Sequence, residues 1–181
     1  GSYSEEAIVR TANADLANSF GNLAQRTLSM IYKNCDGYLP RISGHDPADE
    51  ALFAQIEQTL HKGMPDAFAT LSLHQAAESW MAAVFACNAY VDVQAPWALK
   101  KTDPARMETV LATLYIAIAQ LAVAVAPFIP ASAAQLLDAM GVDPELRSYA
   151  AIGGHWYSPL AESDFRLEQP TGIFPRLELP E

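Results

Sequence analysis

Basic residues are scarce in this sequence. Its 181 residues include 11 lysines and arginines against 21 aspartates and glutamates, so the formal net charge is −10 at pH 7. A protein that holds duplex DNA or RNA by its phosphates needs clustered basic side chains to release counterions. The composition excludes that mode and predicts no DNA binding, so any contact with a nucleic acid must be local. Some basic residues could still gather at one end of the fold: Arg26, Lys33, Arg41, Lys100, Lys101 and Arg106.

Cysteine and histidine are also few. The two cysteines are Cys35 and Cys87, and the four histidines are scattered without the spacing of metal ligands. We expect both cysteines to be reduced core residues, which is typical of a cytoplasmic protein. The sequence therefore predicts no disulfide and no metal site.

Motifs that carry covalent chemistry are absent as well. Gly153 and Gly154 lack the strand and helix that a phosphate-binding loop requires, and no Gly-x-Ser-x-Gly elbow occurs. Carboxylate pairs such as Asp49–Glu50 fall in the first turns of expected helices, where they complement the helix dipole. We expect no catalytic residue and no cofactor-binding residue in this chain.

Apolar residues make up 51% of the chain and the mean hydropathy is +0.06, which indicates a globular protein. Residues 110–129 are apolar enough to raise the question of a membrane span. Thr113, Tyr115, Gln120 and many alanines favour the central helix of a bundle instead, so we expect no membrane contact. The polar start of the chain predicts no signal peptide.

The hydrophobic pattern predicts helices throughout. A first helix from Ser4 to about Lys33 places an apolar stripe on one face. Asp-Pro occurs at 46–47, 103–104 and 143–144, each time before an apolar periodic run, which is a helix-start signal. We predict an all-α antiparallel bundle of about five helices over residues 1–151. Residues 152–181, rich in glycine and proline, are predicted to form an extended tail that packs on another surface.

One polar row follows the outer face of the first helix. It contains Asn22, Arg26, Ser29 and Lys33 at helical spacing, so a carboxamide, a guanidinium, a hydroxyl and an ammonium share one side. The row is either an ordinary solvated face or a binding surface, and by itself the first interpretation is favoured.

A proline breaks the third long helix. Pro96 has no N–H, its ring collides with the carbonyl of Asp92, and it disfavours the α conformation at Ala95, so the helix must end or kink there. Trp97 then leaves a corner beside Lys100 and Lys101. Such a ring either fills a gap between helices or stacks on an unpaired base whose phosphate the lysines meet.

Three segments together resemble the anticodon-binding domain of methionyl-tRNA synthetases. Residues 13–26 read NADLANSFGNLAQR, Asn88 and Tyr90 precede Pro96-Trp97, and residues 173–178 read IFPRLE, similar to the family's closing LFPRIE. The matches occur in the family's order and span nearly the whole chain. The first alone is less specific, because synthetases for other aliphatic amino acids share a similar helix.

The resemblance implies a helical bundle whose exposed corner receives the CAU anticodon of methionine tRNA. By the resemblance Asn22 and Arg26 contact anticodon bases, and Trp97 stacks on the first of them. Lys33, Lys100 and Lys101 are candidates for the RNA backbone, and Pro96 for support of the corner. Tyr90 lies off the helix stripe and is either a packing residue or a second base platform.

The family's adenylate-forming domain and its zinc insertion are not in these residues. The resemblance implies that this chain is part of a cytoplasmic methionine–tRNA ligase, whose full length would use ATP with magnesium, and that the chain alone is inactive. The tail over 152–181 would pack toward the catalytic domain. Three alternatives stay open: a scaffold that binds a protein partner, the equivalent domain of a related synthetase, and a freestanding enzyme with a cleft of perturbed carboxylates or histidines.

Overall fold

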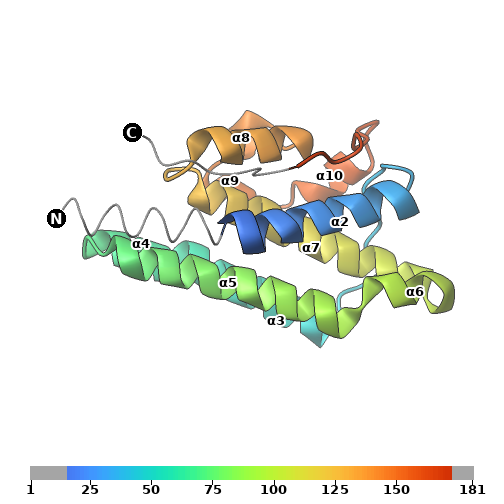
Figure 1. The fold of residues 1–181 in the computed structure, drawn as a ribbon, viewed down its shortest axis with the longest axis horizontal. Helices are drawn as coiled ribbons and strands as arrows, with labels where there is room; N and C mark the ends of the chain where they lie inside the picture. The colour runs from blue at the N-terminus through green and yellow to red at the C-terminus, as the bar shows by residue number, and fades with distance from the viewer. Residues whose placement is uncertain (1–15, 173–181) are drawn as a thin grey trace.

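The structure, a computed structural model, describes residues 16–172, and over that range it is a bundle of helices (Figure 1). The helices are α2 (Gly21–Asn34), α3 (Pro47–Gln58), α4 (Met64–Ala69), α5 (Leu73–Gln94), α6 (Pro96–Thr102), α7 (Pro104–Val125), α8 (Pro130–Ala139), α9 (Tyr149–Ile152) and α10 (Tyr157–Ala161). Short turns of other helix types are η1 (Leu16–Phe20), η2 (Thr59–Gly63) and η3 (Pro144–Leu146). Within the described range, strand-like pairing is limited to one isolated bridge between Tyr38 and Arg166. The all-helical prediction is therefore confirmed.

Two parts of the predictions lie outside the described residues. They are the start of the first helix at Ser4 and the tail motif at 173–178. The described part of the first helix begins with the π-type turn η1 and continues as α2 to Asn34. Its stripe of Phe20, Leu23, Ala24, Leu28 and Ile31 is buried, as the apolar spacing predicts.

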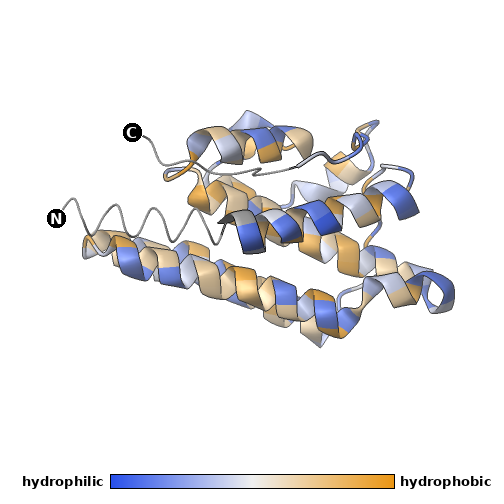
Figure 2. Ribbon diagram, in the orientation of Figure 1, coloured by the Kyte–Doolittle hydropathy of each residue, from blue (hydrophilic) through white to orange (hydrophobic). Residues whose placement is uncertain are grey.

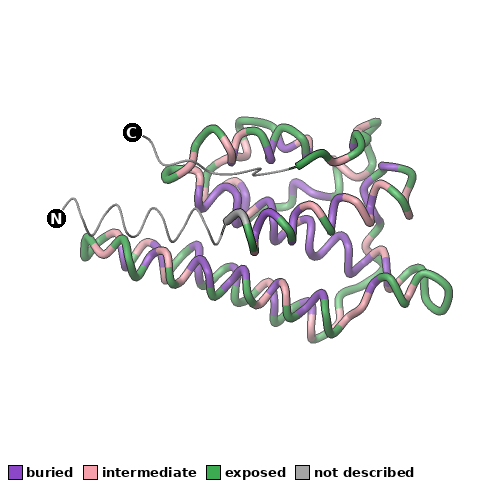
Figure 3. The backbone as a smooth tube through the Cα atoms, in the orientation of Figure 1, coloured by how far each residue is buried: buried purple, intermediate pink, exposed green. Residues whose placement is uncertain are grey.

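Helix α7 is the centre of the bundle. It contacts α2, α3, α5, α6, α8 and α9, and Figure 3 shows it buried along much of its length. It is long and apolar enough to span a membrane, but 83% of its most apolar window is buried inside the protein. A core helix passes the same test of length and composition, and the burial of α7 fits that role.

Aspartate caps open the helices that the Asp-Pro pairs predict. The carboxylate of Asp46 accepts hydrogen bonds from the N–H groups of Ala48 and Asp49, and that of Asp103 accepts from Arg106 N–H. Asp143-Pro144 opens only the short turn η3. Gly63 does not end the helical path: η2 carries it from α3 into α4, and Gly63 lies against Ser79 of α5.

The segment after residue 151 contributes to the same core. Ile152, Trp156, Tyr157 and Leu167 are buried in the main cluster, and the rings of Trp156 and Tyr157 both lie against Tyr115 of α7. Tyr157 donates a hydrogen bond of 2.6 Å to the carbonyl of Pro40. This segment includes α10, a helix that its glycines and prolines did not predict.

Candidate nucleic-acid interface

The α5–α6 corner presents an exposed tryptophan. Helix α5 ends at Gln94, Ala95 takes left-handed backbone angles (φ 46°, ψ 61°), and α6 begins at Pro96. Pro96 is buried, whereas Trp97 is 53% exposed. The proline thus ends α5 as predicted, and the indole projects from the bundle and does not fill a gap.

Arg26 of α2 lies directly beside this ring. Its guanidinium carbon is 5.6 Å from the centroid of the Trp97 ring, a cation–π distance. Nη2 of Arg26 is also 3.8 Å from Oδ1 of Asp92, in the last turn of α5. The Arg26 and Asp92 side chains are 47% and 71% exposed. The structure therefore brings the polar face of α2 and the tryptophan corner together at the surface.

Asn22 lies one turn before Arg26 on the same face of α2 and is exposed. Its Nδ2 donates a hydrogen bond of 2.6 Å to the carbonyl of Asn18. Residues four apart on a helix are about 6 Å apart along its axis. The carboxamide therefore lies within about one nucleotide's length of the guanidinium.

The lysines of this end are exposed. Lys33 lies in the last turn of α2, and Lys100 and Lys101 lie in the last turn of α6. The end of α2 and α6 lie toward the same end of the bundle (Figure 1), and the end of α6 is hydrophilic (Figure 2). Of the six basic residues expected at one end of the fold, Arg26 and Arg41 are exposed as these lysines are, and only Arg106 is partly buried.

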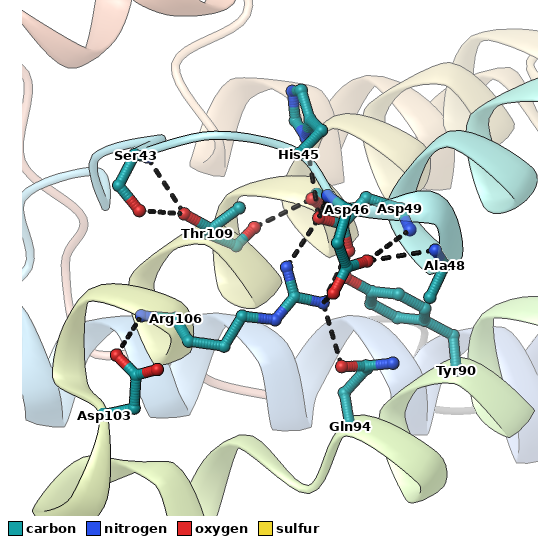
Figure 4. Close-up of polar contacts among 11 residues, drawn as sticks. Ser43, His45, Asp46, Ala48, Asp49, Tyr90, Gln94, Asp103, Arg106 and Thr109 are labelled. Carbon is teal, nitrogen blue, oxygen red and sulfur yellow. Dashed lines mark hydrogen bonds and ion pairs between the residues drawn. The ribbon is translucent and has the colours of Figure 1, made fainter.

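Arg106 does not join that exposed group. It lies in the first turn of α7, and its guanidinium faces the start of α3 (Figure 4). Nη1 donates to Oδ2 of Asp49 at 2.7 Å and Nη2 to Oδ1 at 2.9 Å, a bidentate pair. Nη2 also faces Oε1 of Gln94 at 2.9 Å and Oδ2 of Asp46 at 2.9 Å. This arginine joins α3, α5 and α7.

Asp49 is fully buried and saturated with donors. Its carboxylate also accepts hydrogen bonds from Asp46 N–H and from the hydroxyl of Tyr90. Burial alone would raise the pKa of Asp49, but the hydrogen bonds from Arg106 and Tyr90 hold that pKa below its ordinary value. A charged, fully paired carboxylate is a structural group, not a poised acid or base.

Tyr90 is buried, and burial followed by its bond to Asp49 raises the pKa of its phenol. The alternative of Tyr90 as a second base platform is therefore wrong. Asn88 is half-buried and donates to the Val84 carbonyl of its own helix, which is a structural role.

The thiols are not activated. Burial raises the pKa of Cys87 to about 12, and burial followed by the charge of Glu108 raises that of Cys35 to about 11. Both are free thiols that stay protonated at neutral pH. Their character as reduced cysteines, buried or half-buried, agrees with the sequence.

Two hollows of the described surface are lined by residues other than those of the corner. One of about 490 Å³ lies between α3 and the segment 153–158, and His45, His61 and His155 line it. Among residues 16–172, no group of three histidine, cysteine or acidic residues is placed to hold a metal ion.

Known proteins match this chain in sequence and in structure. A family described as the anticodon binding domain of methionyl tRNA ligase matches residues 39–153. The chain belongs to this family. The match includes Trp97, whereas Asn22 and Arg26 on α2 precede it.

Relatives of this anticodon-binding domain extend the match to the whole chain. The methionine–tRNA ligase of Brucella suis is 45% identical over 179 residues, which is 97% of this chain and 33% of that protein. The Mycobacterium tuberculosis methionine–tRNA ligase is 40% identical over 185 residues, all of this chain and 34% of that protein. The free-state crystal structure of M. tuberculosis methionyl-tRNA synthetase superposes with a TM-score of 0.82 at 37% identity, over 97% of this chain and 35% of that one. The domain thus spans about a third of the length of its relatives.

Sequence reasoning missed part of this site. Asp92 carries a negative charge in the last turn of α5, where the helix dipole is unfavourable to it. An acidic residue at this unfavourable position indicates a nearby cation, and in the structure that cation is Arg26. The roles of Gln94 and Arg106 had no local signal, because Arg106 meets Asp49 across 57 residues of sequence.

Proposed function

We propose that this domain recognises the CAU anticodon of methionine tRNA at the α5–α6 corner. One observation carries the proposal: an exposed indole lies 5.6 Å from the guanidinium of the opening helix. An aromatic face beside donors that can read a base edge is what recognition of unstacked RNA bases requires. Trp97 would stack on one base, and Arg26 and Asn22 would pair with base edges or a phosphate.

The charges of the domain fit a local mode of RNA binding. Lys33, Lys100 and Lys101 are exposed at this end and would meet phosphates next to the stacked base. The net charge of −10 would repel RNA that does not reach the corner. Selectivity would then come from a few contacts and not from a broad basic surface, and DNA would not be a partner.

The rest of the activity belongs to the whole polypeptide. A methionine–tRNA ligase would join methionine to its tRNA with ATP and magnesium in a catalytic domain of the same chain, in the cytoplasm. This domain alone would neither bind ATP nor activate methionine. Residues 152–181, whose described part packs on the bundle, would also face that catalytic domain.

Binding of a CAU anticodon stem-loop to Trp97→Ala tests the proposal. Base–aromatic stacking contributes about 1–3 kcal/mol, so we expect an affinity about 5- to 150-fold lower with little loss of folding stability. Phe128→Ala is the matched control, since Phe128 is an exposed aromatic that stacks on Phe68 of α4, at the end away from α6 (Figure 1).

Stem-loops with other anticodons provide the second control. They should bind weakly to the unaltered domain and should lose less on removal of Trp97. Equal affinities of the unaltered domain and a folded Trp97→Ala variant for the CAU stem-loop would reject the role of the corner.

A further inference from the structure

A side-chain hydrogen bond joins the helices on either side of the corner that carries Trp97. Gln94 is the last residue of α5 and Arg106 lies in the first turn of α7, and Nη2 of Arg106 donates to Oε1 of Gln94 at 2.9 Å. All of α6, with Trp97 and both exposed lysines, lies between these two residues. The bond therefore joins the two ends of the segment, residues 94–106, that carries Trp97.

Arg106 is itself immobilised. Its side chain is only 17% exposed, and Asp49, to which it is paired in a bidentate manner, is fully buried. Asp49 also accepts from the Asp46 N–H and the Tyr90 hydroxyl, so α3, α5 and α7 all hold the carboxylate (Figure 4). A planar guanidinium held at both terminal nitrogens cannot rotate without breaking two charge-assisted bonds. Gln94 is thus tied to a fixed point in the bundle.

The end of α5 needs such a tie. Ala95 occupies left-handed backbone angles, which are strained for a residue other than glycine. The interaction of Arg26 with the Trp97 ring does not supply the tie, because Arg26 is itself 47% exposed. The turn is held by backbone hydrogen bonds from Ala95 N–H to Val91 and from Ala98 N–H to Ala95, and by the packing of buried Pro96 and half-buried Leu99. The bond from Arg106 to Gln94 adds a side-chain link from this turn to the buried pair.

We propose that Arg106 is a positioning residue for RNA binding: through Gln94 it fixes the end of α5 and so the direction in which Trp97 projects. The inference rests on the proposed role of Trp97 in stacking on a base. It adds that an ordered ring is preorganised for the base, so that RNA binding need not order the corner. Arg106 contacts no nucleotide in this mechanism.

Gln94 is the right place to break the link. Truncation of Arg106 would leave Asp49 buried without its cation and endanger the fold. Gln94→Met removes only the acceptor and leaves Arg106 its bonds to Asp49 and Asp46. Gln94→Glu keeps an acceptor for the guanidinium and serves as the rescue. Gln75→Met is the matched control, because Gln75 is exposed near the other end of α5.

The order of the Trp97 ring is the primary readout, measured by ¹⁵N relaxation of its indole N–H in the RNA-free 181-residue chain. Trp97→Phe assigns the signal. Trp80 and Trp156 are internal references, because both indoles donate to backbone carbonyls at 2.9 Å. In Gln94→Met we expect the Trp97 order parameter to fall from about 0.8 to below about 0.6, with both references unchanged. The melting temperature should fall by only about 2–4 °C.

Affinity for the CAU stem-loop is the second readout. Gln94→Met should bind about three- to tenfold more weakly, the range expected for one hydrogen bond, and Gln94→Glu should return to within about twofold of the unaltered chain. An unchanged Trp97 order parameter in Gln94→Met, or equal loosening of Trp80 and Trp156, would overturn the positioning role. A lower Trp97 order parameter with unchanged affinity for the stem-loop would show that positioning of the ring does not contribute to RNA binding, and would overturn the proposal. Failure of the proposed function itself would give a different result, namely unchanged affinity of Trp97→Ala for the stem-loop.

Discussion

Two arginine–aspartate pairs flank the α5–α6 corner, and they differ in every physical respect. Arg26 and Asp92 are 3.8 Å apart with side chains 47% and 71% exposed, and the guanidinium is shared with an aromatic ring. Arg106 and Asp49 are 2.7 Å apart at 17% and 0% exposure, in bidentate geometry. The first pair is hydrated and can exchange one partner for another at little cost. The second cannot, because either member alone would be a charge without its counterion inside the bundle.

The contrast separates a surface that binds from the frame that holds it. Exposed pairs contribute little to stability, so Arg26 is free to turn toward a base without loosening α2. The buried pair joins α3 to α7, and Arg106 also bonds Gln94 at the end of α5.

The largest effect is expected from loss of the buried cation. Arg106→Met leaves the fully buried Asp49 carboxylate without its partner, so the free energy of unfolding should fall by about 3–5 kcal/mol. Urea denaturation followed by circular dichroism measures it. Arg26→Met, which removes an exposed arginine of the same size, should change stability by less than about 1 kcal/mol. Similar losses in the two variants would contradict the distinction between frame and surface.

The second effect concerns RNA. Arg26→Met removes a charged donor next to Trp97, so affinity for the CAU stem-loop should fall by about 1.5–3 kcal/mol. Arg166→Met is a close control, since Arg166 likewise lies 5.4 Å over an aromatic ring and pairs with an exposed aspartate, but its partners are Tyr38 and Asp36 and not Trp97. Titration of labelled stem-loop into both variants gives the comparison. If Arg166→Met weakened binding as much as Arg26→Met, the corner would not be the specific site.

Much of this arrangement can be predicted from the sequence, for reasons visible in particular residues. Asp46 and Asp103 predict helix starts because an N-cap depends only on the residues next to it. Pro96 predicts the corner because the missing N–H is a property of that one residue. The roles of Asn22, Arg26 and Trp97 are implied by motif resemblance. Helical spacing alone favours an ordinary solvated face for Asn22 and Arg26, and the break at Pro96 alone leaves Trp97 either packed or exposed. The corner geometry then places Arg26 against Trp97.

What could not be predicted depends on contacts between distant segments. Asp49 has the local appearance of a helix-dipole residue, and only the fold reveals that Arg106 and Tyr90 converge on it. Arg106 looked like one more surface cation for the same reason. Residues 152–172 looked extended because glycine and proline dominate the local signal, whereas the burial of Trp156 and Tyr157 against Tyr115 decides the outcome.

A third, smaller effect follows from pH. The pKa of Asp49 is lowered in the fold below the ordinary value of about 3.9. A carboxyl with a lower pKa in the folded state contributes stability above its unfolded pKa and loses that contribution as pH falls through the folded value. The unfolding free energy should therefore drop from about pH 5 downward, with up to about 1.4 kcal/mol per pH unit from this group. Asp49→Asn, less stable at neutral pH, should show a correspondingly flatter profile, and parallel profiles would refute the assignment.

The smallest effect is the coupling within the exposed pair, and it is the sharpest test of the comparison. A double-mutant cycle of Arg26→Met and Asp92→Asn should give a coupling free energy of about 0.2–1 kcal/mol that shrinks as salt is raised from 0.05 to 0.5 M. The cycle of Arg106→Met and Asp49→Asn should give a larger coupling with little salt dependence, because water and ions do not reach a carboxylate that is 0% exposed. If the exposed pair coupled as strongly as the buried one, Arg26 would be fixed in the free domain. RNA would then have to break that pair before it could bind, and the corner would be a closed site, not one already open to a base.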